Sequence, residues 1–210
     1  MNQNKHGMIY VIEGIDSSGK STLCDMLKEK LNGERLNVVT YHFPGKDINT
    51  LGKVVYDIHH SKITFPKKIP NLSLQVLHVA AHIDLWLNYI NDSINKREII
   101  ILDRFWWSTY AYGKLSNIDT QTLMNLISVE KTCYDDNDVR LYFYVIRESS
   151  MNHNINLNDN YLELAEMYEH KSKTYIVNNN SDISVVFDFI YEKIHNDILS
   201  ELSPLENKNI

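Results

Sequence analysis

The segment that most constrains this chain is residues 14–21, Gly-Ile-Asp-Ser-Ser-Gly-Lys-Ser, which follows the apolar run Ile-Tyr-Val-Ile at 9–12. Glycines at both ends of such a loop let backbone N–H groups turn inward onto phosphate oxygens. A helix predicted to begin near Lys20 would add the positive end of its dipole. The pattern predicts a phosphate-binding loop between a strand and a helix.

The side chains of this loop have distinct expected roles in binding ATP and Mg²⁺. Lys20 would reach the β- and γ-phosphates, and the Ser21 hydroxyl would ligate magnesium. A glycine-rich turn without function is the alternative, but the amphipathic helix predicted after the loop, with leucines at 23, 27 and 31, argues against it. The expected ATP-binding residues are Gly14, Ser17, Ser18, Gly19, Lys20, Ser21 and Thr22.

Apolar, β-branched runs alternate with segments of helical period along the rest of the chain. We predict strands at 8–13, 37–43, 98–103, 139–146 and 174–177. We predict helices at 20–32, 50–60, 71–93, 119–132, 161–173 and 183–199. This alternation is typical of a parallel sheet with crossover helices. We therefore expect a single α/β domain over residues 1–210 with the P-loop NTPase fold, a five-stranded parallel sheet flanked by helices on both faces.

Composition limits the classes of partner and the compartment that we expect for this chain. The formal net charge of -6 argues against a general nucleic-acid binder, which usually carries a basic face. Cys24 and Cys133 are too few and too far apart for a disulfide framework or a zinc cluster. No apolar run approaches the roughly 20 residues needed to span a bilayer. We expect a cytoplasmic protein that binds small nucleotides and neither nucleic acid nor membrane.

An acidic residue ends the third predicted strand. Asp103 follows Ile-Ile-Ile-Leu at 99–102, and Arg104 comes next. A strand end beside the phosphate loop is where an acid that holds the magnesium shell is needed, and a guanidinium there suits a phosphate. A surface turn with a local ion pair is the alternative, and the phosphate loop makes it the weaker reading. Asp103 and Ser21 are therefore the expected metal-binding residues.

Four ordered motifs resemble those of the thymidylate kinase family of nucleoside monophosphate kinases. They are Glu-Gly-Ile-Asp at 13–16 with Gly-Lys-Ser-Thr at 19–22, Phe-Pro-Gly-Lys at 43–46, Asp-Arg-Phe at 103–105, and Ile-Val-Asn at 176–178 before the last helix. The resemblance implies the fold, Mg²⁺-ATP as phosphoryl donor, a nucleoside monophosphate as acceptor, and a homodimer built on helix faces.

The resemblance also implies roles for individual residues. Asp16 would lie near the sugar 3′-hydroxyl and the acceptor phosphate. Tyr161 would approach the sugar 2′ position, although an aromatic residue that starts a helix usually belongs to the core. Of Trp106 and Trp107, we expect one in the core and one lining the acceptor pocket. The expected substrate-binding residues are Asp16, Phe43, Lys46, His78, His82, Arg104, Ser108, Tyr112 and Tyr161.

The chain departs from the family at the base pocket. His78 and His82 align with a phenylalanine that stacks on thymine and an arginine that bonds its O4. Histidines four apart also suit zinc, but no third ligand is evident in the nearby sequence. A packed pair is a further alternative. We favour a base-contacting pair, with a pyrimidine of altered preference or a different base both open.

The second departure is the lid. Residues 148–160 are rich in Asn and Ser and hold no Lys or Arg, so we expect a mobile flap or linker that is too polar to pack. Residues 61–70 are expected to form a surface loop and 203–210 a frayed tail. Positive groups must meet the charge that builds on the transferred phosphoryl. We expect Arg147, at the lid hinge, to swing in; an exposed strand-end arginine is the alternative. The expected catalytic residues are Lys20, Asp16, Asp103, Arg104 and Arg147.

Three functions stay open. The leading one is ATP-dependent phosphorylation of thymidylate or a close deoxynucleotide relative. A deoxynucleoside kinase ranks second, because the segment 43–46 lacks the catalytic carboxylate of that class. The third is an ATP-binding protein with degenerate activity. A GTPase is disfavoured, because no Asn-Lys-x-Asp motif follows the later strands.

Overall fold

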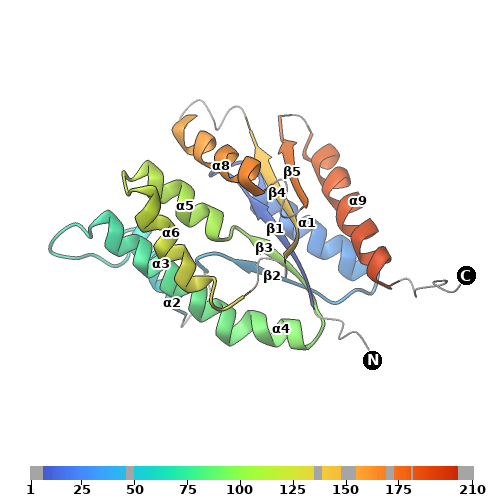
Figure 1. Ribbon diagram of the computed structural model, residues 1–210. Coiled ribbons are helices and arrows are strands. Elements are labelled where there is room, and N and C mark those ends of the chain that lie inside the picture. The colour runs from blue at the N-terminus through green and yellow to red at the C-terminus, as the bar shows by residue number, and fades with distance from the viewer. Residues whose placement is uncertain are drawn as a thin grey trace, which may run out of the picture.

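The computed structural model of the protein describes residues 7–45, 50–134, 139–147, 155–168, 173–180 and 182–202. Its centre is one parallel sheet with the strand order β2-β3-β1-β4-β5 (Figure 1). The strands are β1 Met8–Glu13, β2 Val38–His42, β3 Ile99–Asp103, β4 Val139–Ile146 and β5 Lys173–Asn178. The predicted five-stranded parallel sheet is confirmed.

Helices connect the strands. They are α1 Lys20–Gly33, α2 Leu51–His59, α3 Asn71–Leu85, α4 Asn91–Asn95, α5 Trp106–Leu115, α6 Thr120–Glu130, α8 Ile155–Tyr168 and α9 Ile183–Leu202. A π-helical turn, Trp86–Ile90, joins α3 to α4. The predicted helix at 71–93 is therefore one continuous helical segment with a change of hydrogen-bonding pattern near its end.

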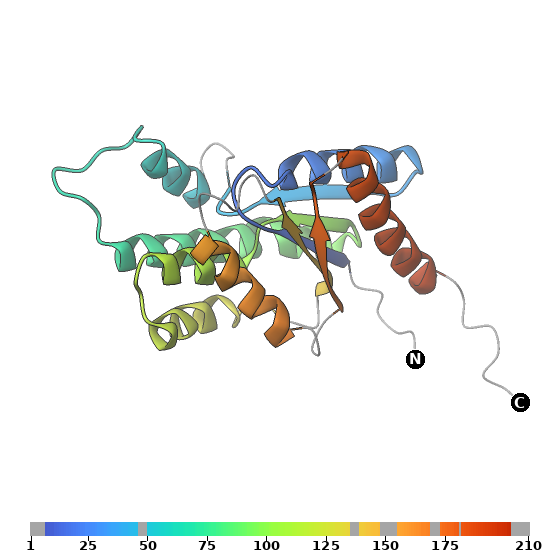
Figure 2. The same cartoon turned by 90° about the horizontal axis from the view of Figure 1, so that it is seen from above.

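Helices cover both faces of the sheet, as the alternating side chains of β1 require. Tyr10 and Ile12 pack with α1 and α9 on one face, whereas Ile9 and Val11 pack with α5, α6 and α8 on the other. Figure 2 shows α1 and α9 together on one side of the strands and α8 on the opposite side. Both faces are apolar because successive strand residues point to opposite sides, and each side meets a helix layer.

Helix α2 and the loop after it extend beyond the edge of the sheet (Figure 2). Helix α2 lies against α3 rather than against a strand. Most residues from 60 to 70 are exposed, so the predicted surface loop at 61–70 is confirmed. This arrangement leaves α2 and α3 as two walls of a space above the carboxyl ends of the strands.

Two helices differ from the prediction. Helix α5 was missed, because its aromatic residues carry no helical apolar stripe; Trp106 and Trp107 are both fully buried in the core. Helix α8 begins at Ile155 instead of 161, so residues 155–160 do not form the unpacked flap expected there. Leu157 stands four residues before Tyr161 and extends the buried stripe of this helix back toward its start. Residues 148–154 and 203–210 lie outside the described residues.

Candidate active site

The phosphate-binding loop joins β1 to α1, as predicted. Gly14 has φ of 149° and Gly19 has φ of 97°, conformations that residues with a Cβ rarely adopt. A Cβ atom on Gly14 would lie 2.4 Å from the carbonyl oxygen of Val145, so glycine is needed there for space as well. The glycines of the motif thus let the loop turn sharply against β4.

A residue outside the motif holds the loop in place through a hydrogen bond. Asn179, just after β5, donates a hydrogen bond from Nδ2 to the carbonyl oxygen of Ser18 over 2.7 Å. It is buried, and its amide lies where a Cβ on Gly19 would collide with it. This role was not predicted, because the contact joins positions 161 residues apart in the sequence.

Lys20 lies at the first turn of α1 with its ammonium folded over the loop. The Nζ atom donates to the carbonyl oxygen of Ile15 over 2.6 Å. Burial, together with the nearby positive charge of Arg104, lowers the pKa of Lys20 to about 8. A bound phosphate would supply the negative charge that this buried cation lacks.

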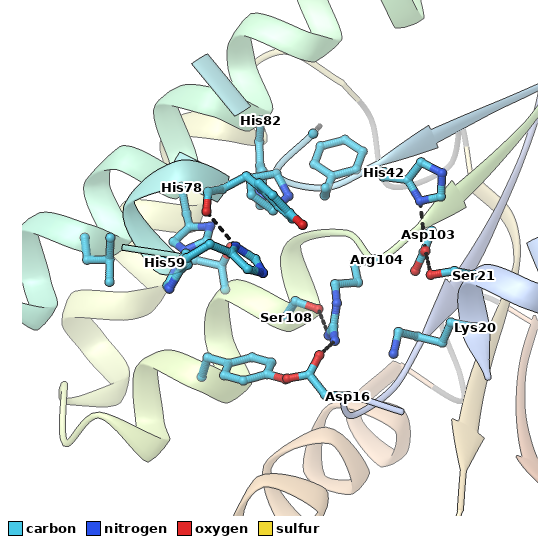
Figure 3. Close-up of a pocket in the computed structure, with 18 of the residues that line it drawn as sticks. Asp16, Lys20, Ser21, His42, His59, His78, His82, Asp103, Arg104 and Ser108 are labelled. Atoms are coloured by element: carbon cyan, nitrogen blue, oxygen red, sulfur yellow. Dashed lines mark hydrogen bonds and ion pairs between the residues drawn. The ribbon is translucent and has the colours of Figure 1, made fainter. Parts of the chain in front are cut away.

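Asp103 and Ser21 meet at the carboxyl end of β3, as predicted. The Ser21 hydroxyl donates to Oδ2 of Asp103 over 2.5 Å, and Nδ1 of His42 donates to the same oxygen over 2.9 Å. Burial alone would raise the pKa of Asp103, but the hydrogen bonds from His42 and Ser21 lower it below its ordinary value. Asp103 is therefore an ionised carboxylate beside the loop (Figure 3).

Arg104 is held in a fixed position next to the loop. Its backbone has φ of 71°, and its Nη1 donates to the Gly14 carbonyl, to Oγ of Ser108 and to the Tyr161 hydroxyl, all within 3.1 Å. Its Nη2 donates to Asp16 Oδ1 over 2.5 Å. Burial opposes the charge, but the tyrosines and Asp16 around it raise the pKa of Arg104 above its ordinary value. The guanidinium stays charged and oriented.

Glu13, at the end of β1, organises the turn that carries Arg104. Its fully buried carboxylate accepts hydrogen bonds from the backbone N–H of Phe105 over 2.7 Å and from the hydroxyl of Ser108 over 2.8 Å. Burial raises the pKa of Glu13 to about 7, partly opposed by Arg104. This role of Glu13 was not predicted from the sequence, where the residue stands out only as the first of its motif.

Histidines gather at the other end of the site. Nδ1 of His82 lies 2.7 Å from Oε2 of Glu130, within hydrogen-bonding distance, and the His82 ring meets that of Phe43 edge to face at 4.6 Å. His78 lies 2.8 Å from His59, Nε2 to Nε2. Burial, together with His82 and His59, lowers the pKa of His78 to about 3, so its ring is neutral near pH 7. Neither Glu130 nor His59 was predicted.

One cavity of about 730 Å³ joins these parts, within the size range of small-molecule sites. It runs from the phosphate-binding loop to the two walls formed by α2 and α3 (Figure 3). The predicted site residues that line it are Asp16, Ser17, Gly19, Lys20, Ser21, Thr22, Phe43, His78, His82, Asp103, Arg104, Ser108 and Tyr112. The Tyr112 hydroxyl donates to Asp16 over 2.7 Å.

Other predicted residues lie elsewhere. Tyr161 is fully buried behind Arg104, which it contacts through its hydroxyl. The expectation that Trp106 or Trp107 lines the pocket is wrong, because both are buried in the core: Trp106 meets Tyr168 edge to face and Trp107 stacks on Tyr142. Arg147 is exposed just after β4 and does not line the cavity. Lys46 lies outside the described residues.

The residues at the loop also suit a hard divalent cation. The Asp103 carboxylate and the Ser21 hydroxyl are oxygen ligands of the kind Mg²⁺ prefers when phosphates and water complete its shell. Across the described part of the chain, no group of three or more His, Cys, Asp or Glu side chains could hold a metal ion by itself. The predicted zinc alternative for His78 and His82 therefore gains no support.

The first strand leads through a glycine-rich loop into a helix, and an acid follows at the end of the neighbouring strand. In a parallel sheet flanked on both faces, this combination defines a P-loop nucleotide-binding protein. The family model for thymidylate kinase matches residues 12–190. The chain belongs to the thymidylate kinase family.

Individual relatives agree with this. The thymidylate kinase of Schizosaccharomyces pombe is 32% identical over 121 residues, covering 57% of this chain and 54% of that protein. The thymidylate kinase of African swine fever virus is 28% identical over 171 residues, covering 81% and 63%. The chain thus spans between about half and two thirds of the length of these curated relatives.

A solved structure shows the same fold. The crystal structure of thymidylate kinase from Ehrlichia chaffeensis superposes with a TM-score of 0.72 at 22% identity, covering 91% of this chain and 98% of that one. The predicted P-loop NTPase fold is confirmed. Within the described residues, no helix is long and apolar enough to cross a membrane.

Proposed function

We propose that this chain transfers the γ-phosphoryl group of ATP to thymidine monophosphate, giving ADP and thymidine diphosphate. The observation that carries the proposal is the single cavity that joins the phosphate-binding loop to the histidine-lined end. Such a cavity has room for a donor phosphate chain at one end and an acceptor base at the other. Membership of the thymidylate kinase family supports the choice of acceptor.

The chemistry would rest on positioning and charge rather than on a covalent intermediate. The loop N–H groups and Lys20 would hold the ATP phosphates. Arg104 is already oriented by four hydrogen bonds, so it would bind the acceptor phosphate without losing much further side-chain entropy. The exposed carboxylate of Asp16 accepts hydrogen bonds from Arg104 and Tyr112, and it would also accept a hydrogen bond from the sugar 3′-hydroxyl.

Magnesium would be held by Ser21 and Asp103 together with the ATP phosphates. When bound, it supplies positive charge that neutralises the phosphate oxygens during transfer. His42 would keep the Asp103 carboxylate oriented when the Ser21 hydroxyl turns from Asp103 toward the metal. This arrangement uses oxygen ligands throughout, in keeping with the preference of Mg²⁺.

The remaining substrate contacts stay part of the proposal. Phe43, His78 and His82 would surround the base, and Ser108 and Tyr112 would line the sugar and phosphate region. The family resemblance suggests a further role for Lys46 at the acceptor. It also suggests Tyr161 near the sugar 2′ position, but the burial of Tyr161 behind Arg104 argues against that role. A role for Arg147 at the transferred phosphoryl is supported only by its position just before residues 148–154, which lie outside the described residues.

We also propose a cytoplasmic homodimer. Both cysteines are free, as a reducing compartment would leave them. Large apolar side chains are exposed on α2 and α3, among them Leu51, Val54, Leu72 and Val76, and such side chains favour association. Light scattering coupled to size-exclusion chromatography measures the mass: about twice that of one chain is expected, and a monomer at micromolar concentration would contradict the dimer.

The test of the activity is a coupled ADP-release assay with dTMP, dUMP, dCMP, dGMP, dAMP and thymidine as acceptors. We expect turnover with dTMP and none with thymidine. Turnover with thymidine alone would instead support the deoxynucleoside kinase alternative. If folded protein that still binds ATP turns over none of these acceptors, the proposed kinase activity would be overturned. That result would favour the alternative of an ATP-binding protein with degenerate activity.

A further inference from the structure

A buried carboxylate is linked to Arg104 through a chain of hydrogen bonds. Glu13 is fully buried and does not line the cavity, whereas Arg104 and Ser108 do. Oε1 of Glu13 accepts hydrogen bonds from the backbone N–H groups of Phe105 over 2.7 Å and of Ser108 over 3.2 Å. Its Oε2 lies 2.8 Å from the Ser108 hydroxyl. Glu13 therefore cannot touch a ligand in the cavity and would act on it through its neighbours.

The hydroxyls of Ser108 and Tyr161 connect this carboxylate to the guanidinium. Ser108 Oγ lies 2.7 Å from the Tyr161 hydroxyl oxygen, and Nη1 of Arg104 donates to both oxygens over 3.1 Å. Figure 3 shows the bond between Arg104 and Ser108. Tyr161 is fully buried, and among the described residues its hydroxyl has no other hydrogen-bond partner. These contacts leave few places for the two hydroxyl hydrogens.

Arg104 sets the direction of these bonds, because a guanidinium donates hydrogen bonds and cannot accept one. The hydrogen of the buried Tyr161 hydroxyl therefore has Ser108 Oγ as its acceptor. The Ser108 hydrogen is then left for Oε2 of Glu13. Two backbone N–H groups already point at Oε1, so a proton on either oxygen of Glu13 conflicts with a donor. The ionised carboxylate satisfies every group in the chain.

A protonated Glu13 would reverse the direction of the chain. Its O–H would donate to Ser108 Oγ, and the Ser108 hydroxyl would then donate to Tyr161. The Tyr161 hydrogen would be left facing the guanidinium, where it has no acceptor. An unpaired buried donor disfavours this arrangement about tenfold or more, and movement of Arg104 away from Tyr161 would relieve it. The protonation of Glu13 thus controls how firmly Arg104 is held.

We propose that Glu13, as a carboxylate, is a positioning residue that orients Arg104 for binding of the acceptor phosphate. It acts through the hydroxyls of Ser108 and Tyr161. The inference rests on the proposed function, which assigns the acceptor phosphate to Arg104. It adds a dependence of acceptor affinity on the protonation of a group that the acceptor does not touch. ATP binding should not share this dependence, because the loop N–H groups and Lys20 hold the ATP phosphates.

Glu13 titrates in a range where this dependence can be measured. Burial raises its pKa to about 7, partly opposed by the positive charges of Arg104 and Lys20. The other titratable side chains near it, Tyr144 and Tyr161, keep their protons because burial raises the pKa of both hydroxyls above the ordinary value. Raising the pH from about 6 to 8 converts Glu13 to the carboxylate, so the affinity for the acceptor should increase over that range.

Glu13→Gln holds the chain in its reversed direction at every pH. The amide oxygen can accept from the two backbone N–H groups, while the amide nitrogen can only donate to Ser108 Oγ. At pH 8 we expect the Kd for dTMP, measured by isothermal titration calorimetry, to be about tenfold higher in this variant than in wild type. At pH 5.5 the two proteins should bind dTMP equally, because wild-type Glu13 is then protonated. The KM for ATP should be the same in both.

Glu163→Gln is the matched control, since Glu163 pairs with Lys114 and neither residue lines the cavity. It should bind dTMP as wild type does at both pH values. Equal binding of dTMP by wild type and Glu13→Gln at pH 8 would overturn the inference. Weaker binding by wild type than by Glu13→Gln at pH 8 would also overturn it, because the Glu13 charge would then act by direct repulsion of the phosphate.

Ser108→Ala tests the route of the effect, and it keeps the inference testable if Glu13→Gln does not fold. The variant retains Glu13 but lacks the hydroxyl that links it to Arg104. The ratio of the Kd for dTMP at pH 5.5 to that at pH 8 should be about tenfold smaller in Ser108→Ala than in wild type. Adding Glu13→Gln to Ser108→Ala should cause no further loss of affinity. A ratio equal to that of wild type would overturn the positioning role.

Turnover, measured by ADP release, separates the inference from the proposed function. Tighter binding of dTMP by wild type than by Glu13→Gln at pH 8, without phosphorylation, would keep the role of Glu13 and remove the kinase. Phosphorylation with the same KM for dTMP in both proteins at pH 8 would keep the kinase and remove the role of Glu13. Folded wild type that neither binds nor phosphorylates dTMP would overturn both.

Discussion

His42 and Asp103 are register partners on neighbouring parallel strands, and Nδ1 of His42 donates to Oδ2 of Asp103 over 2.9 Å. The carboxylate that would serve magnesium is therefore held from its own sheet as well as from the loop. The Ser21 hydroxyl donates to the same oxygen of Asp103. Such support of a ligand by its neighbours commonly tunes metal affinity.

Removing the His42 imidazole should weaken magnesium binding. In His42→Ala we expect the magnesium concentration for half-maximal binding of a fluorescent ATP analogue to rise about 10- to 100-fold. His42→Asn is the matched control, because its amide can donate from nearly the same position as Nδ1. Magnesium dependence that is the same in wild type and both variants would show that Asp103 needs no support from His42.

Glu13 should make the protein less stable as the pH rises from about 4.5 to 7. Its pKa is raised to about 7 in the folded chain from an ordinary value near 4.5, so the folded state binds more protons in that window. Raising the pH therefore favours the unfolded state, by up to about 3 kcal/mol for a shift of this size.

Urea unfolding at pH 5 and pH 8 measures this effect. The control is Glu13→Gln, which lacks the titrating group but shares every other one, so the difference between the two proteins isolates Glu13. We expect the stability of the variant relative to wild type to increase with pH. A difference that stays constant between the two pH values would contradict the raised pKa.

Tyr161 is expected to act through Arg104 rather than on the sugar. Its buried hydroxyl lies 3.1 Å from Nη1 of Arg104 and 2.7 Å from Oγ of Ser108. Tyr161→Phe should reduce kcat/KM for the acceptor about tenfold, the cost of one hydrogen bond to a charged group. The preference for dUMP over UMP should not change. A loss of that preference would instead support the role at the sugar 2′ position that the family resemblance suggests.

Substitution of Arg147 tests whether this residue acts on the transferred phosphoryl group. If it swings in to meet charge on the transferred phosphoryl, Arg147→Ala should slow single-turnover transfer roughly 10³-fold, and Arg147→Lys should restore part of the rate. Rapid-quench measurements with saturating ATP separate this step from binding. A rate equal to wild type in the alanine variant would leave Arg147 as an exposed residue at the end of β4.

Much of the fold could be predicted because its elements follow from local sequence patterns. The strand, glycine loop and helix from 8 to 33 are contiguous, and each part has its own signature of period or turn chemistry. The positions of Lys20, Ser21, Asp103 and Arg104 at one edge of the sheet follow from where strands end in a parallel sheet. Helix α5 escaped detection because it is buried nearly all round, which removes the amphipathic contrast that reveals a helix.

The pairings that shape the site could not be read from the sequence. His42 meets Asp103 across 61 positions, His82 meets Glu130 across 48, and Asn179 meets Ser18 across 161. No periodic pattern links such positions, because strand order and helix packing bring them together. The burial of the His82–Glu130 pair also exists only after the helices have packed.

The sequence by itself thus determined the phosphate-binding loop, because one short motif contains the loop, its lysine and its hydroxyl. The tertiary structure decided the other end. Packing of the helices buries Trp106 and Trp107 in the core and places Tyr161 behind Arg104. It also brings the buried Glu130 next to His82. The physical reason is that a backbone loop binds phosphate through its own N–H groups, whereas a base is recognised by side chains that distant segments must orient.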